Sequence, residues 1–318
     1  MRMLLLALML STLAGAAQAQ SYPSRPVKVI VPFAPGGVAD TIARLWAQNM
    51  SQSLGQNFYV ENHGGGGSNI GMGLAARQPA DGYAVLVAAS SFTINPSLYA
   101  KIPYDPLKDF TPVTLLASTK NVLVVHPSIP AKTVNELIEL VRANPGKYSY
   151  AMSGAGTPNH IQAETLKLAH QLDLTMVPFS GGAPAIQSTV AGHTPVAFTS
   201  LAPVQALVAG EQLRALAVSG LTRAAVWPDV PTMAERGIAG QDDDVFTGLF
   251  APADTPSEIV ATLHVETVKF LAQPEVKQQL DKLGFERGGS APGEFTARVR
   301  LEIAAWAKMI ATAKIPKQ

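Results

Sequence analysis

Short apolar runs alternate with helix-forming segments along most of this chain. Apolar runs at Val27–Val31, Phe58–Val60 and Tyr83–Ala88, the first of them β-branched apart from Lys28, are separated by segments with apolar residues at helical spacing. The segment after the first run places Ile42, Leu45, Trp46 and Met50 on one face. This alternation predicts a parallel sheet with right-handed crossovers, and therefore an α/β fold.

The alternation continues to the end of the chain. Further strands are expected at Thr114–Ala117, Val122–Val125, Tyr148–Met152, Leu174–Val177, Val196–Thr199, Leu213–Val218 and Val245–Ala251. Helices are expected at Val134–Ala143, Ser257–Ala272, Pro274–Leu283 and Pro292–Ala313. Thr133 and Glu136 have the spacing of a capping box at the start of the first of these helices. The stretch Val226–Asp244 is rich in Pro, Gly and Asp and is interpreted as a surface connection.

Four of the expected strands are followed by a glycine-rich turn and then by a helix. The turns are Pro32–Gly37, Gly64–Asn69, Ser153–Pro158 and Pro178–Gly182. Free N–H groups at a helix start, together with the helix dipole, bind anions without a basic side chain. Because ligand sites in open parallel sheets lie at the carboxyl ends of the strands, the turns predict an anion-binding site.

The distribution of the turns, two early and two in the middle of the chain, predicts two lobes that face one small acidic ligand. We expect one lobe from residues 20–122 and 247–318, and a second lobe from residues 123–246. The chain would cross between them near Asn121–His126 and Val245–Ala251. Two crossings would form a hinge, with the ligand cleft between the lobes.

Composition narrows the choice of partners. The chain has 318 residues, of which 47% are apolar and 15% charged, and a net charge of +1 from 24 basic and 23 acidic residues. Since it has no basic stripe or tail, nucleic acid and anionic membranes are not expected as partners. The absence of cysteine excludes disulfides, zinc sites built on Cys and thiol nucleophiles.

The N-terminal residues have the pattern of a secretory signal peptide, residues 1–19. Met1-Arg2 precedes the apolar run Met3–Leu13, and Ala17-Gln18-Ala19 is a small-residue cleavage site before Gln20. Without cysteine, a lipid anchor at the mature start is also excluded. We therefore expect a soluble, monomeric protein exported to a bacterial periplasm.

The candidate ligand contacts are turn residues and a few polar residues at strand ends. They are Phe33, Ala34, Gly36, Gly37, Asp40, Ser90, Ser91, Ser153, Gly154, Thr157, His160, Phe179, Gly181, Gly182 and Thr199. Thr157 can also cap the helix that follows, and His160 could instead contact a neighbouring carbonyl. For every turn, an ordinary strand-to-helix connection is the alternative interpretation.

The sequence contains no complete catalytic or metal-binding motif in its expected structural context. Gly71–Ala76 has the letters of a dinucleotide fingerprint but lies inside an expected helix, and no P-loop occurs. His63–Gly66 is similar to an esterase oxyanion-hole motif, although no Gly-x-Ser-x-Gly elbow accompanies it. The six histidines are scattered and the Asp242–Asp244 run is interpreted as solvated surface, so no metal or cofactor is expected. An esterase-type hydrolase and a sensor that presents its ligand to a signalling receptor stay open as alternatives to a transport receptor.

Motifs distributed over the whole chain after the signal peptide carry a family resemblance. They are Tyr22–Val27, Val31–Gly37 with Asp40, Gly65–Gly71, Asn95–Tyr99, Pro178–Ala185, Pro228–Thr232 and Gly248–Ala253. In this order and spacing they resemble the Bug family, the periplasmic solute-binding proteins of tripartite tricarboxylate transporters. Two places depart from the family pattern: His193–Val196, where many members carry an acidic residue, and Phe246-Thr247, where a Trp is common.

The resemblance implies a type II periplasmic binding protein fold, with two Rossmann-like lobes joined by two crossing segments. It implies a small organic carboxylate as the ligand (a di- or tricarboxylic acid, an acidic amino acid or an aromatic acid) and the permease subunits of the transporter as membrane partners. The turn Phe33–Gly37 would hold one carboxylate, partly through ordered water. The second lobe would contribute Ser153–Thr157 and Phe179–Gly182, and no reaction would be catalysed.

Overall fold

The computed structural model describes residues 22–152, 154, 157–179, 181–241, 244–312 and 314–318. The expected signal peptide, the candidate residue Ser153 and two aspartates of the 242–244 run lie outside the described residues. In the described ranges, no helix combines the length and the apolar character needed to cross a bilayer.

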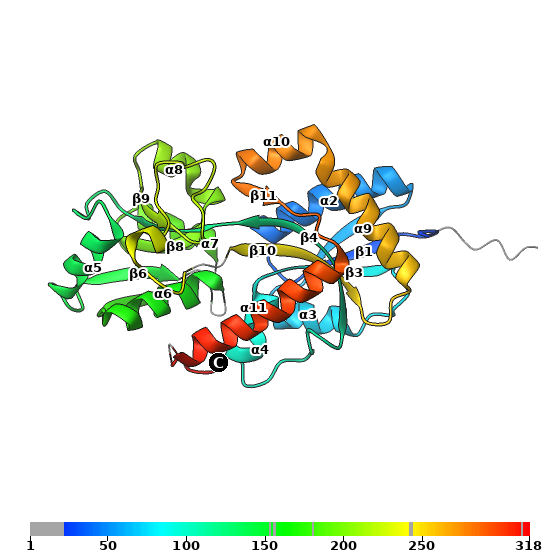
Figure 1. Ribbon diagram of the computed structural model, residues 1–318, viewed down its shortest axis with the longest axis horizontal. Coiled ribbons are helices and arrows are strands. Elements are labelled where there is room, and N and C mark those ends of the chain that lie inside the picture. Colours follow the sequence, from blue (N-terminus) through cyan, green and yellow to red (C-terminus); the bar gives the residue numbers. More distant parts are fainter. Residues whose placement is uncertain (1–21, 153, 155–156, 180, 242–243, 313) are drawn as a thin grey trace, which may run out of the picture.

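The described strands form two sheets (Figure 1). The first sheet has the strand order β11-β4-β10-β3-β1-β2, and the second has the order β7-β6-β8-β5-β9. The strands of the first sheet are β1 (Val27–Val31), β2 (Phe58–Asn62), β3 (Ala84–Ala89), β4 (Phe110–Thr119), β10 (Val245–Pro252) and β11 (Phe285–Arg287). Those of the second are β5 (Asn121–Val125), β6 (Tyr148–Met152), β7 (Leu174–Pro178), β8 (Val196–Ser200) and β9 (Arg214–Val218).

The predicted helices are present with ends that differ by a few residues, and the structure adds α4 and α8, which the sequence did not predict. They are α2 (Val38–Leu54), α3 (Asn69–Ala76), α4 (Ser91–Leu98), α5 (Val134–Arg142), α6 (Pro158–His170), α7 (Gly182–Val190), α8 (Gln205–Ala209), α9 (Ser257–Ala272), α10 (Pro274–Lys282) and α11 (Pro292–Thr312). Short 3₁₀ segments are η2 (Gly66–Ser68), η3 (Ala202–Val204) and η4 (Ala234–Arg236). At the start of α5, Thr133 Oγ1 accepts the N–H of Glu136, whose carboxylate accepts the N–H of Lys132 instead of closing back on Thr133.

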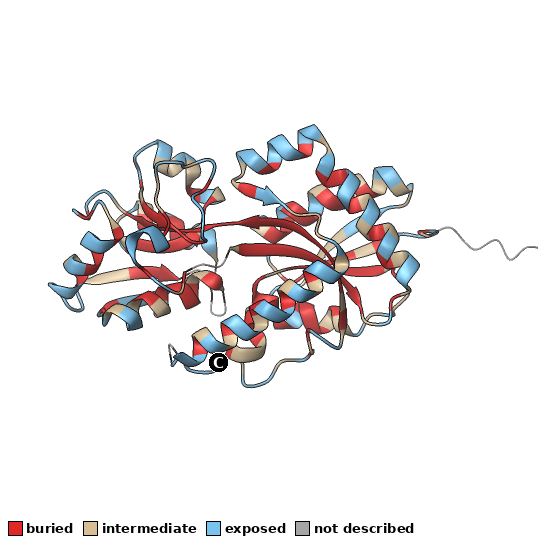
Figure 2. Cartoon of the chain, viewed as in Figure 1, coloured by how far each residue is buried: buried red, intermediate tan, exposed pale blue. Residues whose placement is uncertain are grey.

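The first sheet is mixed, with parallel pairing among β1, β2 and β3 and antiparallel pairing from β3 through β10 and β4 to β11, and helices cover both of its faces. β1 pairs in parallel with β2 and with β3, which confirms the predicted βαβαβ unit. Alternate residues of β1 enter different cores, because successive side chains of a strand point to opposite faces. Val29 packs in the cluster that contains residues of α2, α9 and α10, whereas Ile30 packs in the cluster that contains residues of α3, α4 and α11. Figure 2 shows the resulting buried strands between helices with exposed outer faces.

The second sheet repeats this arrangement on a smaller scale. On one face, Leu123 and Tyr150 pack with α5 and α6; on the other, Val124 and Ala151 pack with α7 and the segment around η3. β6 pairs in parallel with both β7 and β8. Each sheet therefore has its own helix-covered core, the architecture of a two-lobed α/β protein.

The chain passes between the sheets twice. Lys120 alone separates the end of β4 in the first sheet from the start of β5 in the second. The return ends at Val245, where β10 begins, and β4 and β10 run side by side as an antiparallel pair. Both crossings lie slightly ahead of the expected positions, because Asn121–Val125 and Val245–Pro252 already belong to the sheets that they enter.

The interpretation of residues 226–244 as a surface connection is wrong for part of the segment. Met233 and Ile238 are 2% and 4% exposed and belong to the core of the second sheet. The N–H of Val218 donates to the carbonyl of Pro231, and that of Met233 donates to the carbonyl of Val218, which attaches the segment to the end of β9. Proline and glycine residues lie in turns of this segment, but the side chains of Met233 and Ile238 bury part of it in the core.

Candidate functional site

The strand registers place the four glycine-rich turns on edges that face the opposite sheet. In the first sheet, Ala89 at the carboxyl end of β3 pairs with Thr247, near the start of β10, so this edge lies beside the crossing. In the second, Ser200 at the carboxyl end of β8 pairs with Asn121, the first residue after the other crossing. Since β1 and β2 run parallel to β3, and β6 and β7 run parallel to β8, all four turns lie on these two edges. Figure 1 shows β4 and β10 linking the two halves between them.

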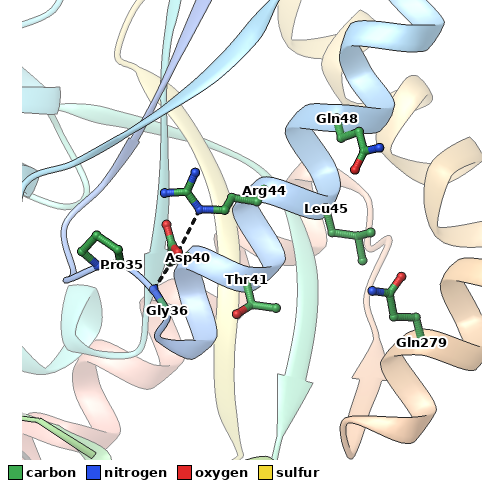
Figure 3. Close-up of a pocket in the computed structure, with 8 residues that line it drawn as sticks. All are labelled: Pro35, Gly36, Asp40, Thr41, Arg44, Leu45, Gln48 and Gln279. Carbon is green, nitrogen blue, oxygen red and sulfur yellow. Dashed lines mark hydrogen bonds and ion pairs between the residues drawn. The ribbon is translucent and has the colours of Figure 1, made fainter. Parts of the chain in front are cut away.

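The turn after β1 is held by the side chain of Asp40. Ala34–Gly37 is exposed, but Asp40 in the first turn of α2 is 2% exposed. Asp40 Oδ2 accepts the N–H of Gly36 at 2.8 Å and Arg44 Nε at 3.0 Å (Figure 3). Burial disfavours the ionised carboxyl, but these bonds and a third from Asn62 outweigh it and hold the pKa of Asp40 below its ordinary value. The Gly36 amide is thus engaged within the protein.

An open depression of about 510 Å³ lies beside this turn. It is lined by Pro35, Gly36, Asp40, Thr41, Arg44, Leu45, Gln48 and Gln279. Figure 3 shows Gln279 of α10 facing the exposed side of α2 across it.

The turn after β2 lies against the first one. A Cβ on Gly64 would be 3.3 Å from the amide nitrogen of Ala34, and one on Gly71 would be 2.7 Å from Pro32 Cα. A Cβ at Gly64 would be tight, and one at Gly71, in the following helix α3, would force the backbones apart. Asn95 Nδ2 donates to the carbonyl of Gly67 at 2.7 Å, so α4 holds the second turn in place. Gly64–Gly66 remains exposed at this edge.

The turns of the second sheet are described in part. Thr157 caps α6 as predicted, since its Oγ1 accepts the N–H of His160 at 3.4 Å, and it also donates to the carbonyl of Gly154 at 2.8 Å. In the neighbouring turn, the N–H of Phe179 donates to the carbonyl of Met152 at 2.8 Å. Gly181 and Gly182 have open space where a Cβ would be, at the start of α7.

His160, in the first turn of α6, is almost completely enclosed. It is 5% exposed, and burial lowers its pKa below the ordinary value despite the opposing charge of Glu164. The imidazole is therefore neutral at pH 7, and its Nδ1 has no hydrogen-bond partner among the described residues. Its neighbour Ile161 is fully buried against Ile94 of α4 and Trp306 of α11, which brings the start of α6 into contact with the first lobe.

The polar residues at the other strand ends differ in role. Ser90 is fully buried and its Oγ accepts the N–H of Phe246 at 3.0 Å, which joins the start of α4 to β10. Ser91 Oγ is buried and has no partner among the described residues. Thr199 is 4% exposed near the end of β8.

Several residues that shape these edges were not among the candidates. Asn62, Arg44 and Asn95 hold the first two turns by side-chain hydrogen bonds. Asn95 could have been found, because it lies in one of the family-like motifs, whereas Asn62 and Arg44 carry no local signal. Within the described ranges, no group of three or more His, Cys, Asp or Glu could hold a metal ion.

Comparison with known proteins agrees with this architecture. The family described as "Tripartite tricarboxylate transporter family receptor" matches residues 42–314. Protein BugT of Bordetella pertussis is 31% identical over 300 residues, which cover 94% of this chain and 92% of BugT.

Solved structures match over nearly the whole chain. Rpa4515 of R. palustris, solved with adipate, is 33% identical with a TM-score of 0.87, and the match covers 93% of this chain and 100% of that one. MatC of Rhodopseudomonas palustris, solved with bound malate, is 32% identical with a TM-score of 0.82, over 91% of this chain and 100% of MatC.

The matching family consists of receptors, so the prediction that the chain is no enzyme is confirmed and the esterase alternative falls. The two-lobed periplasmic binding protein fold is confirmed by the same relatives. The chain belongs to the tripartite tricarboxylate transporter receptor family, as its Bug-like motifs predict.

Proposed function

We propose that this protein is a periplasmic receptor that captures a small organic carboxylate between its two lobes and delivers it to a membrane permease. The observation that carries the proposal is the placement of four glycine-rich turns on facing sheet edges. Relatives solved with adipate and with malate support a carboxylate as the ligand. We propose a di- or tricarboxylic acid, an acidic amino acid or an aromatic acid.

Backbone amides would supply most of the attraction for the ligand. None of the four turns contains Lys or Arg. The helices α2, α6 and α7 begin at three of them, and the N-terminal N–H groups of a helix bind a carboxylate with the help of the helix dipole. Closure of the lobes would exclude water and strengthen these hydrogen bonds, because they act more strongly in a medium of low dielectric constant.

We assign the contacts to the exposed parts of the turns. In the first lobe these are Ala34 and Gly37, since the Gly36 amide is engaged by Asp40, with Phe33 packing half-buried beside them. In the second lobe they are the exposed Gly182 and the half-buried Gly154, Thr157, Phe179 and Gly181. Ser153 belongs to this group by its position in the sequence.

Delivery would follow from the two-lobed fold. The receptor, acting as a monomer with residues 1–19 removed on export, would close around the acid and present its closed form to the permease subunits. A permease that recognises the closed form distinguishes the loaded receptor from the empty one. A sensor role would use the same capture and closure, and a permease-dependent uptake assay separates the two.

Calorimetry of the purified mature chain tests the proposal. The panel should contain adipate, malate, citrate, aspartate and benzoate, with the uncharged adipamide as a control for the carboxylates. We expect at least one acid to bind with a dissociation constant of about micromolar or below, and adipamide to give no heat. Absence of heat for every acid, or equal binding of adipamide, would reject a carboxylate receptor.

A further inference from the structure

We infer that Asp40, together with Asn62 and Arg44, is a positioning group that fixes the carboxylate-binding turn and does not itself touch the ligand. The inference rests on the proposed function and changes the role expected for Asp40. It is carried by a closed set of hydrogen bonds around one buried carboxylate.

Both oxygens of Asp40 are used inside the protein. Oδ2 accepts the N–H of Gly36 and Nε of Arg44, and Oδ1 accepts Asn62 Nδ2 at 2.8 Å. The side chain of Asp40 is 3% exposed. A carboxylate placed in this way has little capacity left for a ligand.

The same bonds connect the two ends of the turn. Asn62 Nδ2 also donates to the carbonyl of Phe33 at 3.1 Å, and Arg44 Nη2 donates to Asn62 Oδ1 at 2.9 Å. Asn62 pairs with Val31 in the sheet, so its side chain lies next to the residue from which the turn begins. The Phe33 carbonyl and the Gly36 amide are thus held by side chains from β2 and α2.

This arrangement decides which donors of the turn remain. Pro35 has no N–H, and the Gly36 N–H is taken by Asp40. The N–H groups of Ala34 and Gly37 have no backbone or side-chain acceptor among the described residues, and both residues are exposed. Gly36 has φ of +81°, a conformation that glycine adopts without strain and that turns the backbone between these two donors. The network therefore orients the amides of Ala34 and Gly37 for an anion.

The positive charge of Arg44 neutralises the negative charge of Asp40 beside the proposed anion site. A carboxylate one helical turn from an anion site repels the ligand, unless a cation neutralises it. Arg44 makes that ion pair at 3.0 Å, with its own side chain half exposed beside the depression of Figure 3. Loss of Arg44 should then weaken binding more for ligands with more negative charges, which a purely structural role would not produce.

The test compares Asp40→Ala, Asp40→Asn and Arg44→Met with the control Asp105→Asn. Asp105 resembles Asp40, because its Oδ1 accepts the N–H of Leu107 and its Oδ2 pairs with Lys108, but it lies in the connector before β4. Binding of adipate and citrate is measured by calorimetry, and the amide resonance of Gly36 is followed by NMR. Melting temperature checks that each variant is folded.

We expect Asp40→Ala to weaken both acids by about tenfold or more and to shift the Gly36 resonance, because a hydrogen bond to a charged group is lost. Asp40→Asn keeps one acceptor oxygen and should recover part of the affinity. Arg44→Met should weaken citrate more than adipate, and Asp105→Asn should leave affinity and the Gly36 resonance unchanged.

Two results would overturn the inference. One is unchanged affinity and an unmoved Gly36 resonance in folded Asp40→Ala. The other is a loss in Asp40→Ala that affects only ligands with an amino group, such as aspartate, which would make Asp40 a direct contact. If the wild-type protein bound no acid, the proposed function would fail, while the Gly36 resonance would still decide whether Asp40 positions the turn.

Discussion

Lys120 Nζ lies 3.2 Å from Asp244 Oδ1, and this ion pair joins the two segments by which the chain passes between the sheets. Lys120 is the single residue between β4 and β5, and Asp244 directly precedes β10. Gly220 makes room for the pair, since a Cβ there would lie 2.5 Å from Asp244 Oδ1 and 2.8 Å from Lys120 Nζ. The two crossing segments are thus joined by this ion pair, in a space that Gly220 leaves open, and Glu286 Oε1 lies 3.8 Å from the same Lys120 Nζ.

Breaking this pair should destabilise the protein. The Lys120 side chain is 4% exposed, and burial raises the pKa of Asp244 above its ordinary value despite the attraction of Lys120. Removing one partner leaves the half-buried Asp244 carboxylate without a countercharge, which destabilises the folded state by more than the intact pair stabilises it. We therefore expect Lys120→Met to lower the free energy of unfolding by about 2 kcal/mol. Urea denaturation measures this. Arg223→Met, which breaks the solvent-exposed Arg223–Glu235 pair, should cost clearly less, because water screens exposed ion pairs. Equal losses in the two variants would contradict the buried role of Lys120.

The burial of His160 should appear in the pH dependence of stability. Its folded-state pKa is lowered, first by burial, so the folded protein binds fewer protons at this site than the unfolded chain does. The associated stability is present above the unfolded pKa of about 6.5 and is lost as the pH falls through the folded value. Thermal unfolding between pH 7.5 and 5 should show a steeper decline for the wild type than for His160→Gln. Parallel profiles would show that this imidazole does not lose solvation on folding.

The sheet edges that carry the candidate site could be predicted, because they depend on local patterns and on general rules of topology. The run Val27–Val31 and the face of Ile42 and Trp46 identify strand and helix, and parallel pairing then brings the two turns of each sheet to the same edge of that sheet. Thr157 was recognised as a cap because its acceptor role involves only the next three residues. Such signals are contained in short stretches of sequence.

The roles of Asp40, Ser90 and Lys120 could not be predicted, because each depends on residues far along the chain. Asp40 has the local pattern of a helix-start acid, but Asn62 on the neighbouring strand determines that both its oxygens are occupied. Ser90 is polar at a strand end, and only the position of β10 turns it into an acceptor for Phe246. Alternation of apolar and polar residues contains no information on these partners.

Gly67 should be less tolerant of alanine than its neighbour Gly66. Both have positive φ, +62° and +56°, so both variants carry the strain of a left-handed alanine, about 1–2 kcal/mol. At Gly66 the new methyl would lie 3.6 Å from Ile70, whereas at Gly67 it would overlap the Tyr99 hydroxyl. We expect Gly67→Ala to displace the second turn and to reduce carboxylate affinity more than Gly66→Ala does, measured by calorimetry on folded protein. A larger loss at Gly66 would contradict this account of the turn.

The adjacent residues Ser90 and Ser91 should respond in opposite ways to alanine. Ser90 Oγ satisfies the buried N–H of Phe246, and loss of a buried acceptor costs about 1–3 kcal/mol. Ser91 Oγ is equally enclosed but has no partner among the described residues, so its removal should change the free energy of unfolding by less than about 0.5 kcal/mol. Ser91 is the first residue of α4, directly after β3, on the edge that faces the second lobe. We therefore expect Ser91→Ala to reduce the affinity for the acid and Ser90→Ala to leave the affinity nearly unchanged. Both affinities are measured at a temperature where the two variants are folded. Urea denaturation and calorimetry on the same two variants measure both quantities. If Ser90→Ala weakened binding without loss of stability, this account would be wrong. The hydroxyl of Ser90 would then act in ligand binding, and its hydrogen bond with Phe246 would contribute little to stability.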